Sequence, residues 1–510
     1  MSSFYVENFG CRATQADGAA IEQQFRDRGF DRASRPGIAK FVVLNTCAVT
    51  ASAEQDARSA IRRIRRENPA CEVIVTGCYA QRTPHEVAAL PGVSVVVGNS
   101  HKHNLAQIAL GAQSEKDAFK SSSFVPIAKL STADSSITER GIADPNLQDG
   151  SHSYESSLPS IFVSDIFAHT ELRAAPVFDS ANERTRPNLK VQDGCNNRCS
   201  FCIIPSVRGR SRSLNLNEAL REVNQLVAAG YREVVISGIN LGRWGRDLPG
   251  ETDEKVWSGS AHFAEALSEV EGEDEGRVEW GPRASTLEGL TKAILDHTGL
   301  EKLRISSVEP MDWTDSFIRL MADSPRIAKH AHVPMQSGSD SVLRRMHRKY
   351  RPWHYREKIE KIRAAMPTAA IGADVMVGFP GENSAEFDET RRLIEDLPFT
   401  YLHVFTFSAR PGTPAATMPN QVPVNVVRDR NRILRELASE KKLAFMRSFV
   451  GHNLDAITLN VTSEDSAGSW TEALTDNYLK LKLRGQHASN QWLQANVINA
   501  LDEQLLGTPA

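Results

Sequence analysis

The chain has 510 residues, of which 41% are hydrophobic and 24% are charged, and its formal net charge is −3. These ordinary values exclude a fibrous or strongly basic protein, and the length predicts two to four domains. We find neither an apolar leader after Met1 nor a run of 18 apolar residues, so we expect no signal peptide and no membrane contact. Seven cysteines are too few for a disulfide framework, which predicts a reducing, cytoplasmic location.

Residues 1–111 alternate strand-like and helix-like patterns. Continuous apolar runs typical of buried parallel strands lie at residues 4–7, 40–45, 72–76 and 93–97, with helical patterns at 16–28, 53–67, 84–90 and 104–110. This rhythm predicts an N-terminal domain with a parallel α/β sheet.

Three cysteines of this domain follow the ends of predicted strands. Cys11, Cys47 and Cys78 each come directly after an apolar run, whereas Cys71 precedes one. The carboxyl ends of parallel strands meet at one edge of a sheet, so the three thiols can converge there on a ligand. Three unrelated buried cysteines are the alternative, because free cysteine is often a core residue.

Two long stretches carry no sustained period. Residues 112–186 are rich in Ser, Asp and Ala, and we interpret them as a linker or insertion; residues 247–283 are acidic and form a second insertion. The arginine-rich helix at residues 56–67 is either a solvated face or a phosphate contact.

Residues 187–425 predict six βα units. Strand patterns lie at residues 188–192, 233–237, 302–306, 330–334, 369–377 and 401–406, and helical patterns separate them. Six such units predict a partial (β/α)6 barrel, whose working groups lie at the carboxyl ends of its strands.

Cys195, Cys199 and Cys202 follow the first of these strands at spacing C-x3-C-x2-C. Iron–sulfur clusters are held by cysteine thiolates, and three ligands leave one iron of a four-iron cluster open to a small chelating molecule. A structural zinc site is the alternative, but zinc usually takes four protein ligands, and neither a fourth cysteine nor a close histidine follows Cys202.

Polar and glycine residues end the other strands of this domain. A zwitterionic nucleoside needs close backbone approach, ribose acceptors and amide partners, and the strand ends supply these in Ser237, Gly238, Glu309, Gln336 and Asp374. His330 and His332 alternate on one strand, and we interpret them as structural. A basic run at residues 344–351 is a solvated helix end or a contact to unpaired bases, of which we favour the first.

Residues 426–448 predict a helical connector, and residues 449–510 a small β-barrel with strands near 455–461, 478–483 and 491–498. The fold class is therefore α/β, with an N-terminal parallel sheet, a central partial barrel and a small C-terminal β-barrel.

The stretch at residues 190–209, KVQDGCNNRCSFCIIPSVRG, resembles the methylthiotransferase branch of the radical S-adenosylmethionine (SAM) superfamily. The segments NFGC at 8–11, NTCAVT at 45–50 and TGCYAQ at 76–81 also resemble that family, closest to the subgroup that acts on threonylcarbamoyladenosine (t6A) in tRNA. The resemblance implies two [4Fe–4S] clusters, one on Cys195, Cys199 and Cys202 for SAM and an auxiliary one on Cys11, Cys47 and Cys78. It also implies a SAM pocket formed by residues 304–310 and 332–339.

The implied reaction is methylthiolation at C2 of t6A at position 37, next to the anticodon, with the auxiliary cluster carrying the sulfur. The implied partners are the tRNA anticodon loop and an electron donor such as flavodoxin or ferredoxin, and we expect a monomer. By position the tail corresponds to the family's RNA-binding (TRAM-like) barrel. Three alternatives stay open: isopentenyladenosine tRNA, an aspartate of a ribosomal protein, or a non-catalytic iron–sulfur or zinc protein that binds RNA.

Overall fold

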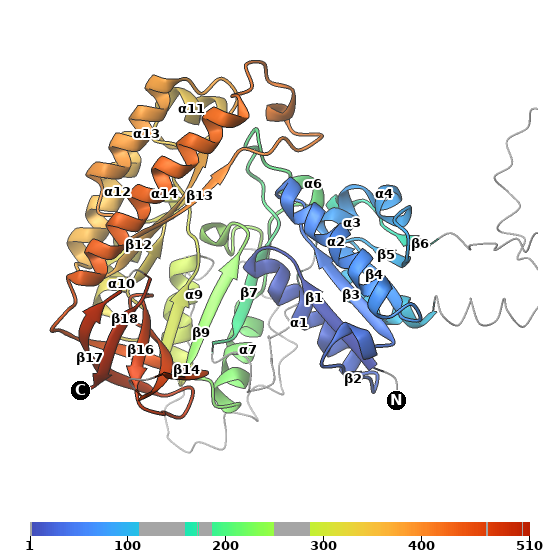
Figure 1. The fold of residues 1–510 in the computed structure, drawn as a ribbon, viewed down its shortest axis with the longest axis horizontal. Helices are drawn as coiled ribbons and strands as arrows, with labels where there is room; N and C mark the ends of the chain where they lie inside the picture. Colours follow the sequence, from blue (N-terminus) through green and yellow to red (C-terminus); the bar gives the residue numbers. More distant parts are fainter. Residues whose placement is uncertain are drawn as a thin grey trace, which may run out of the picture.

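The computed structural model describes residues 3–111, 159–170, 172, 186–248, 286–465, 468–501 and 503–510. Figure 1 shows three parts: an N-terminal α/β domain, a central barrel domain, and a small barrel at the C-terminus. Most of the predicted linker and of the predicted insertion at 247–283 lies outside the described residues. Within the described ranges, no helix is both long and apolar enough to cross a membrane.

The N-terminal sheet has six parallel strands in the order β2-β1-β3-β4-β5-β6. Its strands are β1 (Ser3–Asn8), β2 (Asp31–Arg32), β3 (Phe41–Thr46), β4 (Glu72–Gly77), β5 (Val93–Val97) and β6 (Ser160–Phe162). The edge strands β2 and β6 were not predicted, because two or three residues carry too short a pattern. β6 comes from the stretch that we interpreted as a linker.

Helices cover both faces of this sheet because alternate residues of each strand point to opposite sides. On one face Phe4 and Phe41 pack with Phe25 of α1 (Arg12–Arg26). On the other, Val42 and Val73 pack with α2 (Ala51–Glu67), α3 (Cys78–Arg82) and α4 (Pro84–Ala88). Because all six strands are parallel, their carboxyl ends lie at one edge of the sheet, as the sequence predicted.

The central domain contains the six predicted parallel strands in two adjoining sheets, which confirms the partial barrel. One sheet has the order β10-β9-β7-β8, with β7 (Asn188–Asp193), β8 (Arg212–Ser213), β9 (Glu233–Gly238) and β10 (Lys302–Ile305). The other contains β11 (His330–His332), β12 (Ala370–Val377) and β13 (Tyr401–Thr406). The outer helices are α7 (Leu216–Ala228), α9 (Leu287–His297), α10 (Asp315–Asp323), α11 (Asp340–Arg345), α12 (Pro352–Ala365) and α13 (Ser384–Asp396).

A long helix, α14 (Val424–Arg447), runs along β13 to the C-terminal barrel (Figure 1). That barrel closes in the order β14-β15-β16-β18-β17. Its strands are β14 (Asn453–Asp465), β15 (Gly468–Thr475), β16 (Lys480–Arg484), β17 (Trp492–Ala500) and β18 (Leu505–Pro509). The turn before β16 caps the amino end of the central barrel, where Arg304 donates to the carbonyl oxygen of Asp476 at 3.0 Å.

Candidate functional site

The loop that carries Cys195, Cys199 and Cys202 joins β7 to the short helix α6 (Ile204–Arg208). Gly194 begins this loop with a φ of +70°, and a Cβ atom there would lie 2.0 Å from the carbonyl oxygen of Arg210. Only glycine fits this turn without strain. The amide of Cys202 donates to the carbonyl oxygen of Cys199 at 3.1 Å, which folds the C-x2-C segment into one tight turn.

The three thiols of this loop face one another and polar donors. Asn240 Nδ2 lies 3.5 Å from Cys195 Sγ, and Arg348 Nη1 lies 3.2 Å from Cys199 Sγ. Burial, followed by the neighbouring Cys199 and Cys195, raises the pKa of Cys202 to about 12. Thiols clustered in this way release their protons when they bind a metal. Hydrogen-bond donors directed at the sulfur atoms are a common feature of iron–sulfur centres. The donor set therefore fits a cluster with three cysteine ligands.

Cys11, Cys47 and Cys78 lie together at the sheet edge, where α1 begins after Cys11 and α3 begins at Cys78. Gly10 has a φ of +100°, and a Cβ atom there would lie 2.9 Å from Cys47 Sγ, so glycine lets the Cys11 loop reach Cys47. Burial, followed by the adjacent Cys78 and Cys11, raises the pKa of Cys47 to about 12. Cys71 is buried before β4, at the opposite end of that strand.

The two cysteine sets adjoin across the domain boundary. Ile203 and Val207, which follow Cys202, belong to the same buried apolar cluster as Cys78. The side chain of Asn99 links the Cys78 site to helix α6, because its Nδ2 lies 3.6 Å from Cys78 Sγ and 2.7 Å from the carbonyl oxygen of Val207. The edge of the N-terminal sheet therefore faces the mouth of the central barrel.

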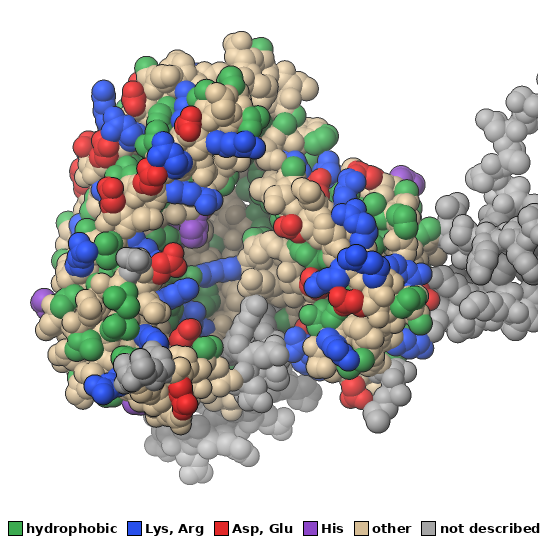
Figure 2. Space-filling model, viewed as in Figure 1, with side chains coloured by type: hydrophobic (Ala, Val, Ile, Leu, Met, Phe, Trp, Pro, Cys, Tyr) green, Lys and Arg blue, Asp and Glu red, His purple; other side chains and the backbone are tan. Residues whose placement is uncertain are grey.

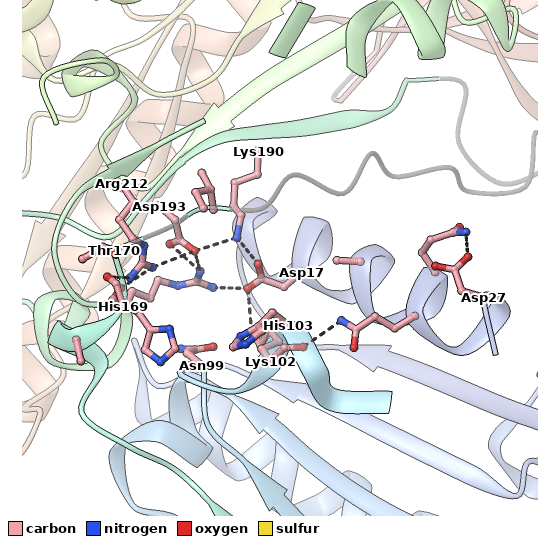
Figure 3. A pocket seen from close by; sticks show the side chains of 16 residues that line it. Asp17, Asp27, Asn99, Lys102, His103, His169, Thr170, Lys190, Asp193 and Arg212 are labelled. Atoms are coloured by element: carbon pink, nitrogen blue, oxygen red, sulfur yellow. Dashed lines mark hydrogen bonds and ion pairs between the residues drawn. The ribbon is translucent and has the colours of Figure 1, made fainter. Parts of the chain in front are cut away.

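A buried ionic network fixes this boundary (Figure 3). Asp17 of α1 accepts from Lys102 and Arg208, both at 3.0 Å, and from Lys190 of β7. Arg208 also donates to both oxygens of Asp193, at 2.9 and 3.1 Å. Burial opposes ionisation of Asp17, but the three cations outweigh it and hold its pKa well below the usual range. The network joins the helix after Cys11 to both ends of the Cys195 loop.

The predicted nucleoside residues lie at or near the barrel mouth. Ser237 and Gly238 end β9, Glu309 follows β10, Gln336 follows β11 and Asp374 lies within β12. Among the described residues, several buried polar atoms here have no hydrogen-bond partner: Ser237 Oγ, Asn240 Oδ1, Ser306 Oγ and Gln336 Oε1. Buried polar groups are normally paired, so these atoms fit a polar ligand such as SAM. The role of these residues stays a prediction.

Two of these positions have further features. Gln336 adopts a φ of +63°, a left-handed conformation that non-glycine residues rarely take and that often marks functional sites. Glu309 forms an ion pair with Arg348, the residue that contacts Cys199. Burial raises the pKa of Glu309 above its usual value, although Arg348 opposes this.

Sequence reasoning missed Arg348 and Asn240 as neighbours of the thiols. We placed Arg348 in a basic run and favoured a solvated helix end, whereas it is 7% exposed beside Cys199. Other members of that run do pair with nearby acids, such as Arg344 with Asp340. Asn240 lies two residues after the predicted Ser237-Gly238 turn, and this position after a strand end was the sequence feature that could have indicated its role.

The arginines of α2 are largely engaged by the chain itself. Arg63 pairs with Glu7 at 2.8 Å, Arg58 pairs with Glu86, and Arg65 donates to the carbonyl oxygen of Pro69. A contact between this helix and phosphate stays a prediction.

Comparisons with known proteins match both cysteine-bearing domains. A model described as uncharacterized protein family UPF0004 matches residues 3–98, and one described as the radical SAM superfamily matches residues 189–394. The threonylcarbamoyladenosine tRNA methylthiotransferase MtaB of Bacillus subtilis is 33% identical and covers 95% of this chain and 91% of its own. This chain belongs to the radical SAM methylthiotransferase family.

Other relatives agree with this membership. MtaB of Aquifex aeolicus is 30% identical over 94% of this chain and 96% of its own. The tRNA-2-methylthio-N(6)-dimethylallyladenosine synthase of Methylacidiphilum infernorum is 26% identical over 100% of this chain and 95% of its own. The methyltransferase TsrM of Kitasatospora setae has a TM-score of 0.46 at 15% identity over 81% of this chain and 74% of its own, a likeness too slight to bear on function.

Family membership makes this protein a radical SAM methylthiotransferase that uses SAM and [4Fe–4S] clusters. It therefore excludes the non-catalytic alternative. The assignment of particular cysteines to each cluster, the electron donor, the monomeric state and the cytoplasmic location stay predictions.

Proposed function

We propose that this enzyme attaches a methylthio group to C2 of N6-threonylcarbamoyladenosine next to the anticodon of tRNA, giving 2-methylthio-N6-threonylcarbamoyladenosine. The observation that carries the proposal is the placement of two three-cysteine sites on either side of one domain boundary, where Asn99 and an apolar cluster join Cys78 to the helix that follows Cys202. One site would activate SAM and the other would hold the sulfur to be transferred. A protein that binds RNA without catalysis would not require two adjacent cluster sites.

In this proposal Cys195, Cys199 and Cys202 hold the cluster that binds SAM, and Cys11, Cys47 and Cys78 hold the auxiliary cluster. When bound, the SAM cluster supplies a radical able to remove an unactivated aromatic hydrogen, which acid–base groups cannot do. The protein's part is to position the reactants. Arg348 orders the Cys199 side of the loop, and the unpartnered Ser237 and Gln336 orient the nucleoside of SAM.

The tRNA must deliver one unstacked base to the barrel mouth. Figure 2 shows a hollow between the N-terminal domain and the rest of the molecule, with Lys, Arg and His side chains along its walls. This hollow supports entry of a single nucleotide from the side of the barrel. The phosphates on either side of that nucleotide would meet the cationic side chains.

The choice of t6A rests on two supports. The segment TGCYAQ at residues 76–81 resembles the corresponding segment of the t6A subgroup. The relatives at 33% and 30% identity described above are named for that substrate. Methylthiolation of isopentenyladenosine is the second candidate, because relatives named for N(6)-dimethylallyladenosine reach 31% identity.

The test uses the full chain with both clusters reconstituted, SAM, and a chemical reductant. Anticodon stem-loops carrying t6A or isopentenyladenosine are supplied separately, and nucleosides are measured by mass spectrometry. We expect a mass gain of one methylthio group on t6A, with 5′-deoxyadenosine formed in parallel. A product on isopentenyladenosine alone would replace the proposal with the second candidate. An absence of nucleoside product, together with modification of a ribosomal-protein aspartate, would overturn both.

A further inference from the structure

Two histidines and one aspartate converge on one face of the β11-β12-β13 sheet. His332 of β11, Asp374 of β12 and His403 of β13 each offer one atom that can bind a metal, and these three atoms lie within 4.8 Å of one another. The three strands are hydrogen-bonded neighbours, so the sheet itself holds the side chains together. The mechanism proposed above does not use this triad.

The distances within the triad are those between two ligands of one ion. His332 Nε2 and His403 Nδ1 each lie 3.3 Å from Asp374 Oδ1. Charge-assisted N–H···O hydrogen bonds are shorter, about 2.7–2.9 Å. Zinc binds histidine nitrogen and carboxylate oxygen at about 2.0–2.1 Å with tetrahedral angles, which places two ligand atoms about 3.3–3.4 Å apart. The observed separations therefore match a tetrahedral zinc site.

The His332 ring supplies an independent observation. His332 is 9% exposed, and its Nε2 has no hydrogen-bond partner among the described residues although Asp374 is near. A nitrogen that faces a tetrahedral ion points about 35° away from a neighbouring ligand atom, so a hydrogen bond to that atom is poorly aligned. On the other side of the ring, Nδ1 lies 3.2 Å from Ser307 Oγ. A second contact of this kind orients most histidines that bind a metal.

A single ion can reach all three atoms of the triad. Two separations are 3.3 Å and the third is at most 4.8 Å, so one point lies about 2.4 Å or less from every atom. The His403 side chain is 61% exposed, so an ion can enter from solvent and a water molecule can bind it. Three protein ligands with one open position are typical of zinc sites that take a further ligand.

The triad adjoins the predicted SAM pocket. The backbone amide of Gln336 donates to the carbonyl oxygen of Asp374 at 2.8 Å, and the side chain of Asp374 was predicted to contact the nucleoside. We propose that His332, Asp374 and His403 instead bind one zinc ion, whose fourth position takes water or another oxygen ligand. The ion joins β13, the last strand of its sheet, to β11 and β12. This site does not depend on the proposed function or on either cysteine site.

The test uses the full chain with both iron–sulfur clusters reconstituted, because free thiols also bind zinc. Zinc sulfate is added anaerobically, unbound metal is removed, and zinc and iron per chain are measured by mass spectrometry. We expect one zinc ion per chain in wild type, without loss of iron. X-ray absorption at the zinc edge should show nitrogen and oxygen ligands at about 2.0–2.1 Å. Sulfur ligands at about 2.3 Å, or no retained zinc, would overturn the proposal.

Variants test whether these residues form the site. Competition with a zinc chelator gives Kd for wild type, His403→Gln, Ser307→Ala and the control His354→Gln, which changes an exposed histidine of α12. We expect Kd to rise at least about 100-fold in His403→Gln, which loses a ligand, and about tenfold in Ser307→Ala, which loses the orienting contact. The control should bind zinc as wild type does. Equal Kd values in wild type and His403→Gln, with thermal melting and iron content unchanged, would refute the assignment.

Discussion

The Asp17 carboxylate is the most informative single group at the domain boundary. It is 5% exposed and accepts from three cations, of which Arg208 is 2% exposed. Asp17→Asn keeps the shape of the side chain but removes the one carboxylate that all three cations share, leaving Asp193 to face Lys190 and Arg208. Breaking a buried ion pair from one side costs about 3–5 kcal/mol. We therefore expect the N-terminal domain to open from the barrel about 10²- to 10⁴-fold more often.

Hydrogen exchange followed by mass spectrometry measures this opening directly. Peptides from α1 and β7 of Asp17→Asn should exchange faster by that factor, while peptides from the C-terminal barrel keep their wild-type rates. The control is Arg63→Gln, which breaks a pair with Glu7 whose side chains are 46% and 24% exposed. Such surface pairs contribute about 1 kcal/mol or less. Equal exchange of α1 in Asp17→Asn and in the control would refute the reasoning.

The same carboxylate predicts a pH dependence of known sign. The folded-state pKa of Asp17 lies below its unfolded value, so its stabilisation is fully present above about pH 4 to 5. It is lost as the pH falls through the folded-state pKa. The difference in exchange between wild type and Asp17→Asn should therefore shrink on acidification below about pH 4. A difference that grows instead would show that the sign is wrong.

Two further predictions concern the barrel. Arg348→Met removes a cation 3.2 Å from Cys199 Sγ, so the midpoint potential of the cluster on that loop should fall in a titration monitored by electron paramagnetic resonance, and an unchanged potential would contradict the contact. Gly372→Ala forces a Cβ atom to within 2.0 Å of Tyr401 Cζ and should destabilise the barrel by about 1–3 kcal/mol in thermal unfolding. Gly299→Ala, whose nearest contact would be an ordinary 3.7 Å, is the control, and equal melting of the two variants would contradict the packing.

Patterns that depend on local sequence predicted most of the fold. In β7 the apolar Leu189 and Val191 alternate with polar residues, whereas β12 is mostly apolar, and both strands lie where they were expected. β15 and β18 of the C-terminal barrel were missed, because their closure depends on distant partners. β18 pairs in parallel with β16, and no local pattern predicts such a pairing.

The residues of the candidate site also fall into those that the sequence could predict and those that it could not. The convergence of Cys11, Cys47 and Cys78 followed from their place after parallel strands, which is a topological argument. Asp17 and Arg348 could not be found in this way, because their importance comes from partners up to 191 residues away in the chain. His332 was interpreted as structural, and the sequence alone could not place it beside Asp374.

The central claim is that six of the seven cysteines hold two clusters. Iron and sulfide content after anaerobic reconstitution tests it for wild type, Cys47→Ala and the control Cys71→Ala. The account predicts about eight irons in wild type and in Cys71→Ala, and about four in Cys47→Ala, because each cubane cluster holds four. About four irons in wild type, with none lost in Cys47→Ala, would contradict the account and leave a single-cluster enzyme.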